Sequence, residues 1–90
     1  MKQALHIVVQ GRVQGVYFRA NTRKQAIRLG LTGMVRNLPD NSVEIIACGN
    51  QQALQQLVTW CHKGPLLAKV SAVISQPYAG DEGFESFEIL

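Results

Sequence analysis

Residues 11–19, GRVQGVYFR, combine two glycines, two arginines and an apolar run between a strand-like and a helix-like stretch. Backbone N–H groups in such a loop can converge with the free N–H groups of a helix N-terminus to form an anion site. Gly11 and Gly15 permit the conformations that a tight concave loop needs. Arg19, in the first helical turn, can match a phosphate with two parallel hydrogen bonds. Two interpretations of the pattern stay open at this point: a phosphate-binding loop, or a Gly-containing turn with solvated arginines, which two glycines alone would favour.

Other phosphate chemistries do not fit these residues. The segment lacks the Gly-Lys-Ser/Thr of a Walker loop and the spacing of a dinucleotide fingerprint. A cysteine-nucleophile phosphatase needs an arginine six residues after its cysteine, but Leu54 stands at that distance from Cys48. A metal-assisted phosphatase needs clustered Asp, Glu or His, whereas the acids here are scattered or lie near the C-terminus. The residues therefore do not favour a metal-assisted phosphatase.

Length and composition predict one domain, residues 1–90. The chain is 47% hydrophobic and 17% charged, which favours a packed core over disorder. Nine Lys and Arg against six Asp and Glu give a net charge of +3, without a basic run. Arg12, Arg19, Arg23 and Arg28 all lie in the first third of the chain. This asymmetry favours a localised anion site over a nucleic-acid surface.

Targeting signals are not evident. The N-terminus lacks the longer apolar region and cleavage site of a signal peptide, and no segment has the ~20 apolar residues of a membrane span. Two cysteines, Cys48 and Cys61, do not make a disulfide framework and are typical of small buried side chains. We therefore expect a cytoplasmic protein without a membrane partner.

The order of elements follows from periodicity and turn chemistry. Residues 4–9 alternate as a strand, and residues 18–29 have the spacing of a helix that ends at Gly30. Two β-rich runs, 31–37 and 42–49, flank the turn LPDN and predict a hairpin. Asn50 is a good N-cap for a helix that Gly64-Pro65 stops. Residues 68–76 form a fourth strand, and residues 84–90 form a short extended segment at an edge.

This β-α-β-β-α-β order predicts an α+β fold of the ferredoxin-like split-βαβ type. We expect an antiparallel sheet with two helices on one face and a short C-terminal strand. In that fold, the first loop leads directly from the first strand into the first helix, as the anion site requires.

The motifs resemble those of one known family, the acylphosphatases. GRVQGVYFR is similar to the family signature G-x-V-Q-G-V-x-F-R, with Tyr17 at a variable position. The stretch GLTGMVRNLPDNSVEIIACG resembles the second family motif, in which a strand ends in an asparagine before the hairpin. GPLLAKVSAV and FESFEI are similar to the late strands, so the resemblance covers nearly the whole chain.

The resemblance implies hydrolysis of acyl phosphates to a carboxylate and inorganic phosphate, without a metal or cofactor. Arg19 would hold the phosphoryl group, and Asn37 would orient the water for in-line attack. The substrate is expected to be a small acyl phosphate, and the protein a monomer. The residues implied to form the cradle are Gly11, Arg12, Val13, Gln14, Gly15, Val16, Tyr17 and Phe18.

Two alternatives stay open at this point. Ferredoxin-like sheets also serve as anion- or RNA-binding modules without catalysis, although the run VEIIACG carries no aromatic residue for stacking bases. The other alternative is an acylphosphatase-like domain that acts on carbamoyl phosphate within a larger maturation protein. Because the predicted fold is complete at Leu90, we expect a free-standing enzyme.

Overall fold

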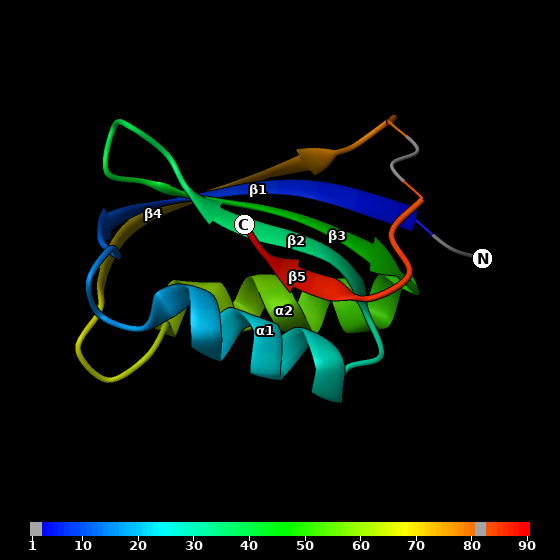
Figure 1. The fold of residues 1–90 in the computed structure, drawn as a ribbon, viewed down its shortest axis with the longest axis horizontal. Helices are drawn as coiled ribbons and strands as arrows, with labels where there is room; N and C mark the ends of the chain where they lie inside the picture. Colours follow the sequence, from blue (N-terminus) through cyan, green and yellow to red (C-terminus); the bar gives the residue numbers. More distant parts are fainter. Residues whose placement is uncertain (1–2, 81–82) are drawn as a thin grey trace.

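The computed structural model describes residues 3–80 and 83–90 and confirms the predicted order of elements. Five strands and two helices follow one another as β-α-β-β-α-β-β (Figure 1). None of the described helices has the length and apolar character needed to span a membrane. The bounds are β1 Gln3–Arg12, α1 Phe18–Arg28, β2 Thr32–Asn37, β3 Val43–Gly49, α2 Gln51–Lys63, β4 Lys69–Pro77 and β5 Phe87–Ile89.

The strands form one sheet in the order β4-β1-β3-β2-β5. The first four strands pair in antiparallel fashion, as predicted. The sequence indicates no direction for the short C-terminal strand β5, which pairs in parallel with β2. The reason is topological, because the chain passes from β4 at one edge to β5 at the opposite edge and enters there in the direction of β2. The sheet is therefore mixed.

Both helices cover the same face of the sheet (Figure 1). Alternate strand residues supply that face, including the fully buried Ile7, Val9 and Ile45. Their helical partners recur at intervals of three or four residues, as an amphipathic helix requires. The buried helical positions are Phe18, Thr22 and Ala26 in α1 and Ala53, Leu54, Leu57 and Cys61 in α2.

The helix ends carry the predicted signals. The Asn50 side chain accepts a hydrogen bond from the Ala53 N–H at 2.8 Å, so it caps α2. Gly30, just after α1, has a φ of 74°, which is the left-handed conformation expected beyond a helix C-terminus. These local signals fix where α1 ends and where α2 begins.

Strand β1 is longer than the sequence predicts, because pairing with β4 continues past Gln10. The register shifts between Gln10 and Gly11, and Gly11 then pairs with Val70 and Arg12 with Lys69. Gly11 has a φ of 125°, and a Cβ at this position would lie 2.2 Å from the Lys69 carbonyl oxygen. Gly11 therefore permits a close contact between two strands, one residue before β1 ends at Arg12.

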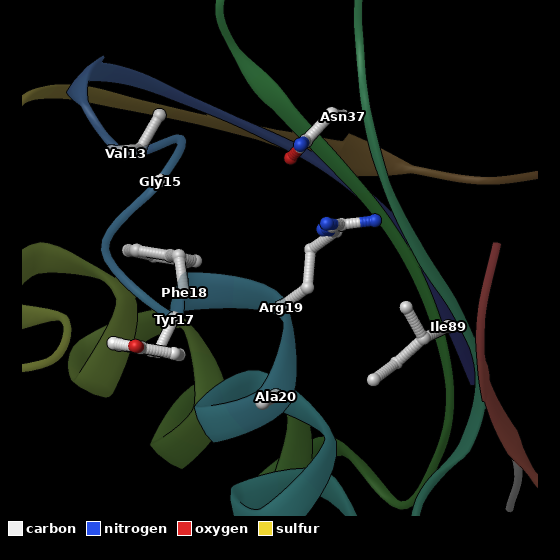
Figure 2. A pocket seen from close by; sticks show the side chains of 8 residues that line it. All are labelled: Val13, Gly15, Tyr17, Phe18, Arg19, Ala20, Asn37 and Ile89. Atoms are coloured by element: carbon white, nitrogen blue, oxygen red, sulfur yellow. The ribbon is translucent and has the colours of Figure 1, made fainter.

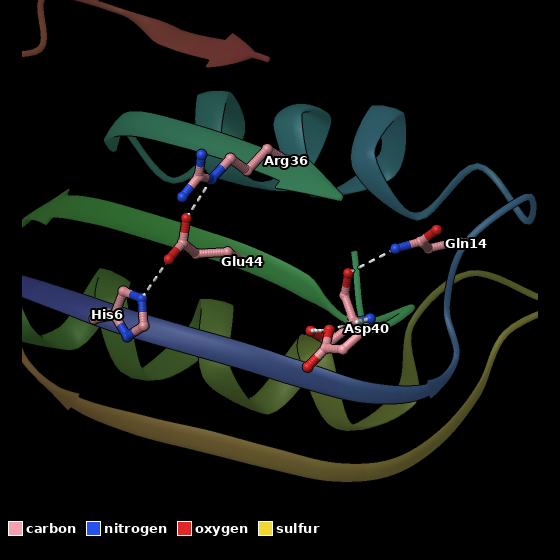
Figure 3. Close-up of polar contacts among 6 residues, drawn as sticks. His6, Gln14, Arg36, Asp40 and Glu44 are labelled. Carbon is pink, nitrogen blue, oxygen red and sulfur yellow. Dashed lines mark hydrogen bonds and ion pairs between the residues drawn. The ribbon is translucent and has the colours of Figure 1, made fainter. Parts of the chain in front are cut away.

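The open face of the sheet carries a chain of three polar side chains, shown in Figure 3. His6 of β1 and Arg36 of β2 bind the two carboxylate oxygens of Glu44, at 2.8 Å and 2.5 Å respectively. Burial, the largest single influence, would raise the pKa of Glu44, but the hydrogen bonds and charges of His6 and Arg36 together lower it. The contact ties β1, β3 and β2 together across the sheet.

The burial of Cys61 can be tested through the pH dependence of the free energy of unfolding. Burial raises the pKa of the Cys61 thiol from 9.0 to about 12. Between these values the unfolded chain releases a proton that the folded chain keeps, so the free energy of unfolding should fall as pH rises. The expected contribution is at most about 1.4 kcal/mol per pH unit.

Urea unfolding of the wild type and of Cys61→Val between pH 8 and 11 measures this contribution. All other groups of the chain are common to both proteins, so their contributions cancel in the comparison. The free energy of unfolding of the variant should fall less per pH unit than that of the wild type. Equal slopes would show that Cys61 ionises as readily in the folded chain as in the unfolded chain.

Candidate active site

The cradle loop, residues 13–17, connects β1 to α1. Apolar side chains of the loop and of Phe18 hold it against the hydrophobic core. Val13 and Phe18 are 1% exposed, and Val16 is also buried. The Phe18 ring packs against Trp60 of α2, with ring centroids 5.3 Å apart. Because these side chains point into the core, the polar backbone of the loop is left for the surface.

Two residues of the cradle loop adopt left-handed backbone conformations. Gly15 has a φ of 74°, and Tyr17 has a φ of 63° and a ψ of 26°. Left-handed residues in a tight loop can turn successive N–H groups toward one concave side. In the described part of the chain, no side chain caps the N-terminus of α1, and its first turn has no acidic residue. The first N–H groups of α1 are therefore available to an anion.

A pocket of about 320 Å³ opens at this junction (Figure 2). Arg19 is the only charged side chain that lines it within the described residues. The other walls come from the cradle loop, the end of β2 and the C-terminal strand. The lining residues are Val13, Gly15, Tyr17, Phe18, Arg19, Ala20, Asn37 and Ile89.

Asn37, the last residue of β2, faces Arg19 across the pocket, and Figure 2 shows the amide and the guanidinium pointing toward one another. The Oδ1 atom of Asn37 is buried and has no hydrogen-bond partner among the described residues. A buried polar atom without a partner costs free energy unless a water molecule or a ligand satisfies it. Asn37 therefore offers an acceptor to whatever enters the pocket.

The C-terminal strand is held by two arginines of α1. Arg23 Nε donates to the Phe87 carbonyl oxygen at 3.0 Å, and Arg19 Nη1 donates to the Leu90 carbonyl oxygen at 3.4 Å. Parallel pairing with Val35 of β2 places Ile89 beside the pocket. The contact at 3.4 Å is long, so the Arg19 guanidinium keeps donors for a ligand.

Gln14 ties the cradle loop to the β2–β3 hairpin. Its Nε2 donates to the carbonyl oxygens of Leu38 and Ser42, each at 2.9 Å (Figure 3 shows the second bond). The turn between them is closed by the Leu38 N–H, which donates to the Ser42 carbonyl oxygen at 2.8 Å. Because Asn37 immediately precedes this turn, Gln14 fixes the distance between the loop and Asn37.

Of the residues singled out in the sequence, the structure brings six to one pocket: Arg19, Asn37, Val13, Gly15, Tyr17 and Phe18. The other four residues lie outside the lining. Gly11 and Arg12 are at the end of β1, the Gln14 amide bonds to the hairpin, and the Val16 side chain is in the core. Sequence reasoning missed Ala20 and Ile89. Ala20 directly follows the signature, whereas Ile89 had no local signal, because its position depends on a pairing between distant segments.

Metal ligands do not gather at this site. Within residues 3–80 and 83–90, no group of three or more His, Cys, Asp or Glu side chains is placed to hold a metal ion. Among the described residues, Arg19 is the charged group that the pocket offers to an anion.

By its fold and site, the protein is a ferredoxin-like α+β protein in which an arginine and an asparagine face one pocket. The model of the Acylphosphatase family matches residues 5–89. The chain is 50% identical over 82 residues to an acylphosphatase of Marinobacter nauticus, with 91% of this chain and 89% of that relative covered. The chain therefore belongs to the acylphosphatase family.

Solved structures agree with this assignment. An acylphosphatase from Coxiella burnetii is 37% identical, with a TM-score of 0.94 over 99% of this chain and 93% of the other. The acylphosphatase from Bacillus subtilis is also 37% identical, with a TM-score of 0.93 over 100% of this chain and 99% of the other.

The Gln14 contacts lead to a prediction about stability. Gln14→Glu places a carboxylate against two carbonyl oxygens and removes both donors, so the free energy of unfolding should fall by about 2 kcal/mol at pH 7. Protonation gives the carboxyl one O–H donor, and the loss should therefore shrink as pH is lowered toward 4. Urea unfolding at both pH values measures the effect.

The matched control is Gln10→Glu, the same chemical change at an exposed residue of β1. This variant should stay within about 0.5 kcal/mol of the wild type. Equal stability of the two variants at pH 7 would mean that the Gln14 contacts contribute nothing.

Proposed function

We propose that this chain is an acylphosphatase enzyme that hydrolyses acyl phosphates to a carboxylate and inorganic phosphate. The observation that carries the proposal is one pocket that joins Arg19, the N-terminus of α1 and the unpartnered amide oxygen of Asn37. Its volume of about 320 Å³ suits a small molecule. Membership of the family supports the same reaction.

Arg19 and the cradle loop bind the phosphoryl group in this proposal. The N–H groups of the loop and of the first turn of α1 donate to the phosphoryl oxygens, and the Arg19 guanidinium adds charge-assisted hydrogen bonds. Phosphoryl transfer passes through a loose transition state whose charge is spread over the equatorial oxygens. Donors held in place before the reaction stabilise that charge without reorganisation.

Asn37 holds the attacking water. Its Oδ1 accepts a hydrogen bond from the water, whose lone pair is then directed at phosphorus. As the new P–O bond forms, the P–O bond to the acyl group breaks, and its electron pair leaves on the carboxylate. The proton of the water passes to a phosphoryl oxygen, because an amide cannot act as a base near neutral pH. Carboxyl groups have a pKa of about 4, so the leaving group needs no general acid.

The proposal also covers metal dependence, oligomeric state, cellular compartment and substrate class. The donors that neutralise the phosphoryl charge belong to the chain itself, so we propose a reaction without a metal. We also propose that the active unit is a monomer. The buried thiol of Cys61 is compatible with the reducing cytoplasm. A small pocket with one arginine favours a small acyl phosphate over a nucleic acid.

The function is tested by hydrolysis of benzoyl phosphate in the presence of a strong chelator. Purified protein should release benzoate and inorganic phosphate in equal amounts, at a rate that prior removal of metals does not change. If exhaustive chelation abolished turnover and Mg²⁺ or Zn²⁺ restored it, the mechanism based on Arg19 and backbone amides would be wrong. No turnover with or without metals would exclude the enzyme.

Variants of Arg19 and Asn37 should separate binding from catalysis. Arg19→Gln removes charge-assisted hydrogen bonds, so competitive inhibition by inorganic phosphate should weaken about 10- to 100-fold. Arg19→Lys should restore little of the phosphate inhibition, because a point charge does not reproduce the planar guanidinium. In Asn37→Ala, phosphate inhibition should stay near normal while kcat falls about 100-fold or more, since only the orientation of water is lost.

Asn37→Asp is the sharper variant, because it keeps the shape and places a negative charge beside the phosphate. It should bind phosphate more weakly than Asn37→Ala. Melting temperatures of the same preparations serve as the control, since a structural role would lower stability and activity in parallel. A fully active Asn37→Ala, or an Arg19→Gln with undiminished phosphate inhibition, would remove that residue from the site.

A further inference from the structure

Tyr17 has a conformation that its side chain does not favour. Its φ of 63° and ψ of 26° lie in the left-handed region, which is uncommon for residues other than glycine and an outlier for bulky ones. Strained backbone of this kind persists at functional sites more than elsewhere. Glycine or asparagine would adopt the same conformation at lower cost. The presence of a large aromatic residue therefore calls for a physical reason.

Packing does not supply that reason. The Tyr17 side chain is 75% exposed, and it makes no cap hydrogen bond to α1. The structural contacts of this residue come from its backbone, because the Tyr17 carbonyl oxygen accepts hydrogen bonds from the Asn21 N–H at 3.1 Å and from Asn21 Nδ2 at 2.9 Å. Any residue at position 17 could make both bonds. Tyr17 is one of the residues that line the pocket.

The geometry of the reaction indicates what the ring contacts. This step rests on the proposed function, in which water held by Asn37 attacks phosphorus in line with the leaving group. The acyl group must then leave the phosphate on the side opposite to Asn37. Figure 2 shows Asn37 and Tyr17 at opposite ends of the pocket, with Arg19 between them. The acyl group therefore emerges on the side of Tyr17.

We propose that Tyr17 determines acyl specificity, with its ring packing against the acyl group of the substrate. The preferred substrates are then aromatic or bulky apolar acyl phosphates rather than acetyl phosphate. The other pocket residues agree with this preference, since Ala20 and Ile89 are exposed apolar side chains. Within the described residues the pocket has no acidic side chain and no donor on this side that would select a polar acyl group. An aromatic ring gives contact area at a low cost in conformational entropy.

The test compares kcat/KM for benzoyl phosphate and acetyl phosphate in the wild type, Tyr17→Ala and Tyr17→Phe. Tyr17→Ala should lower the ratio of benzoyl to acetyl about 3- to 10-fold, the size expected for one lost aromatic contact. Tyr17→Phe keeps the ring and should keep the ratio within about 2-fold, because the hydroxyl is not needed for packing. Inhibition by inorganic phosphate, which has no acyl group, should not change in either variant.

Leu66→Ala is the matched control. Leu66 is a large apolar side chain, 98% exposed and outside the pocket lining, so its removal should leave the ratio unchanged. Tyr17→Gly is the second variant, because it removes the ring and also relieves the positive φ. Its melting temperature should match or exceed that of the wild type, while its ratio should fall as in Tyr17→Ala.

The outcomes distinguish this inference from the function on which it rests. A wild type that hydrolyses neither substrate would overturn the proposed function and the inference together. If the wild type hydrolyses both and the ratio is unchanged in Tyr17→Ala and Tyr17→Gly, the function stands and the specificity role is wrong. An equal loss for both substrates would also overturn it, because Tyr17 would then act on the cradle loop and not on the acyl group.

Discussion

The pocket depends on the attachment of the cradle loop to the β2–β3 hairpin. Arg19 and the N-terminus of α1 are placed by the loop, whereas Asn37 is placed by β2, and these two parts are distant in sequence. Gln14 connects them with two hydrogen bonds of 2.9 Å to the hairpin carbonyls. Since a misplacement of about 1 Å can cost ~100-fold in rate, this attachment matters more than its modest free energy indicates.

The other side of the pocket is built by the C-terminal strand. β5 has only three residues, and a strand this short is weakly held by its ladder alone. Arg23 adds a hydrogen bond to the Phe87 carbonyl, and the Phe87 side chain is 2% exposed in the core. Arg19 and Arg23 therefore both contact the C-terminal segment, but of the two only Arg19 also lines the pocket.

Local signals in the sequence predicted most of the fold, and long-range contacts account for what it did not predict. Asn50, Gly30 and the period of each segment act within one helix or turn, so the element order could be derived from them. The parallel pairing of β5 depends on a partner far along the chain, and so does the contact of Gly11 with β4. Arg19 could be assigned from its place at a helix N-terminus, whereas Asn37 alone was a strand-end residue until the family motif was considered.

Departures from favourable local structure gather at this one pocket. Tyr17 is a bulky residue in a left-handed conformation, and Asn37 buries an amide oxygen without a partner among the described residues. Each feature lowers stability by itself, while the strands and caps elsewhere agree with their sequence. A chain that is locally consistent outside its site and strained within it is the pattern expected when a fold supports a function. A hydrogen bond from a water would remove the cost at Asn37. Contact with an acyl group would leave the backbone strain at Tyr17 in place, but it would give the ring that this strained position carries a function.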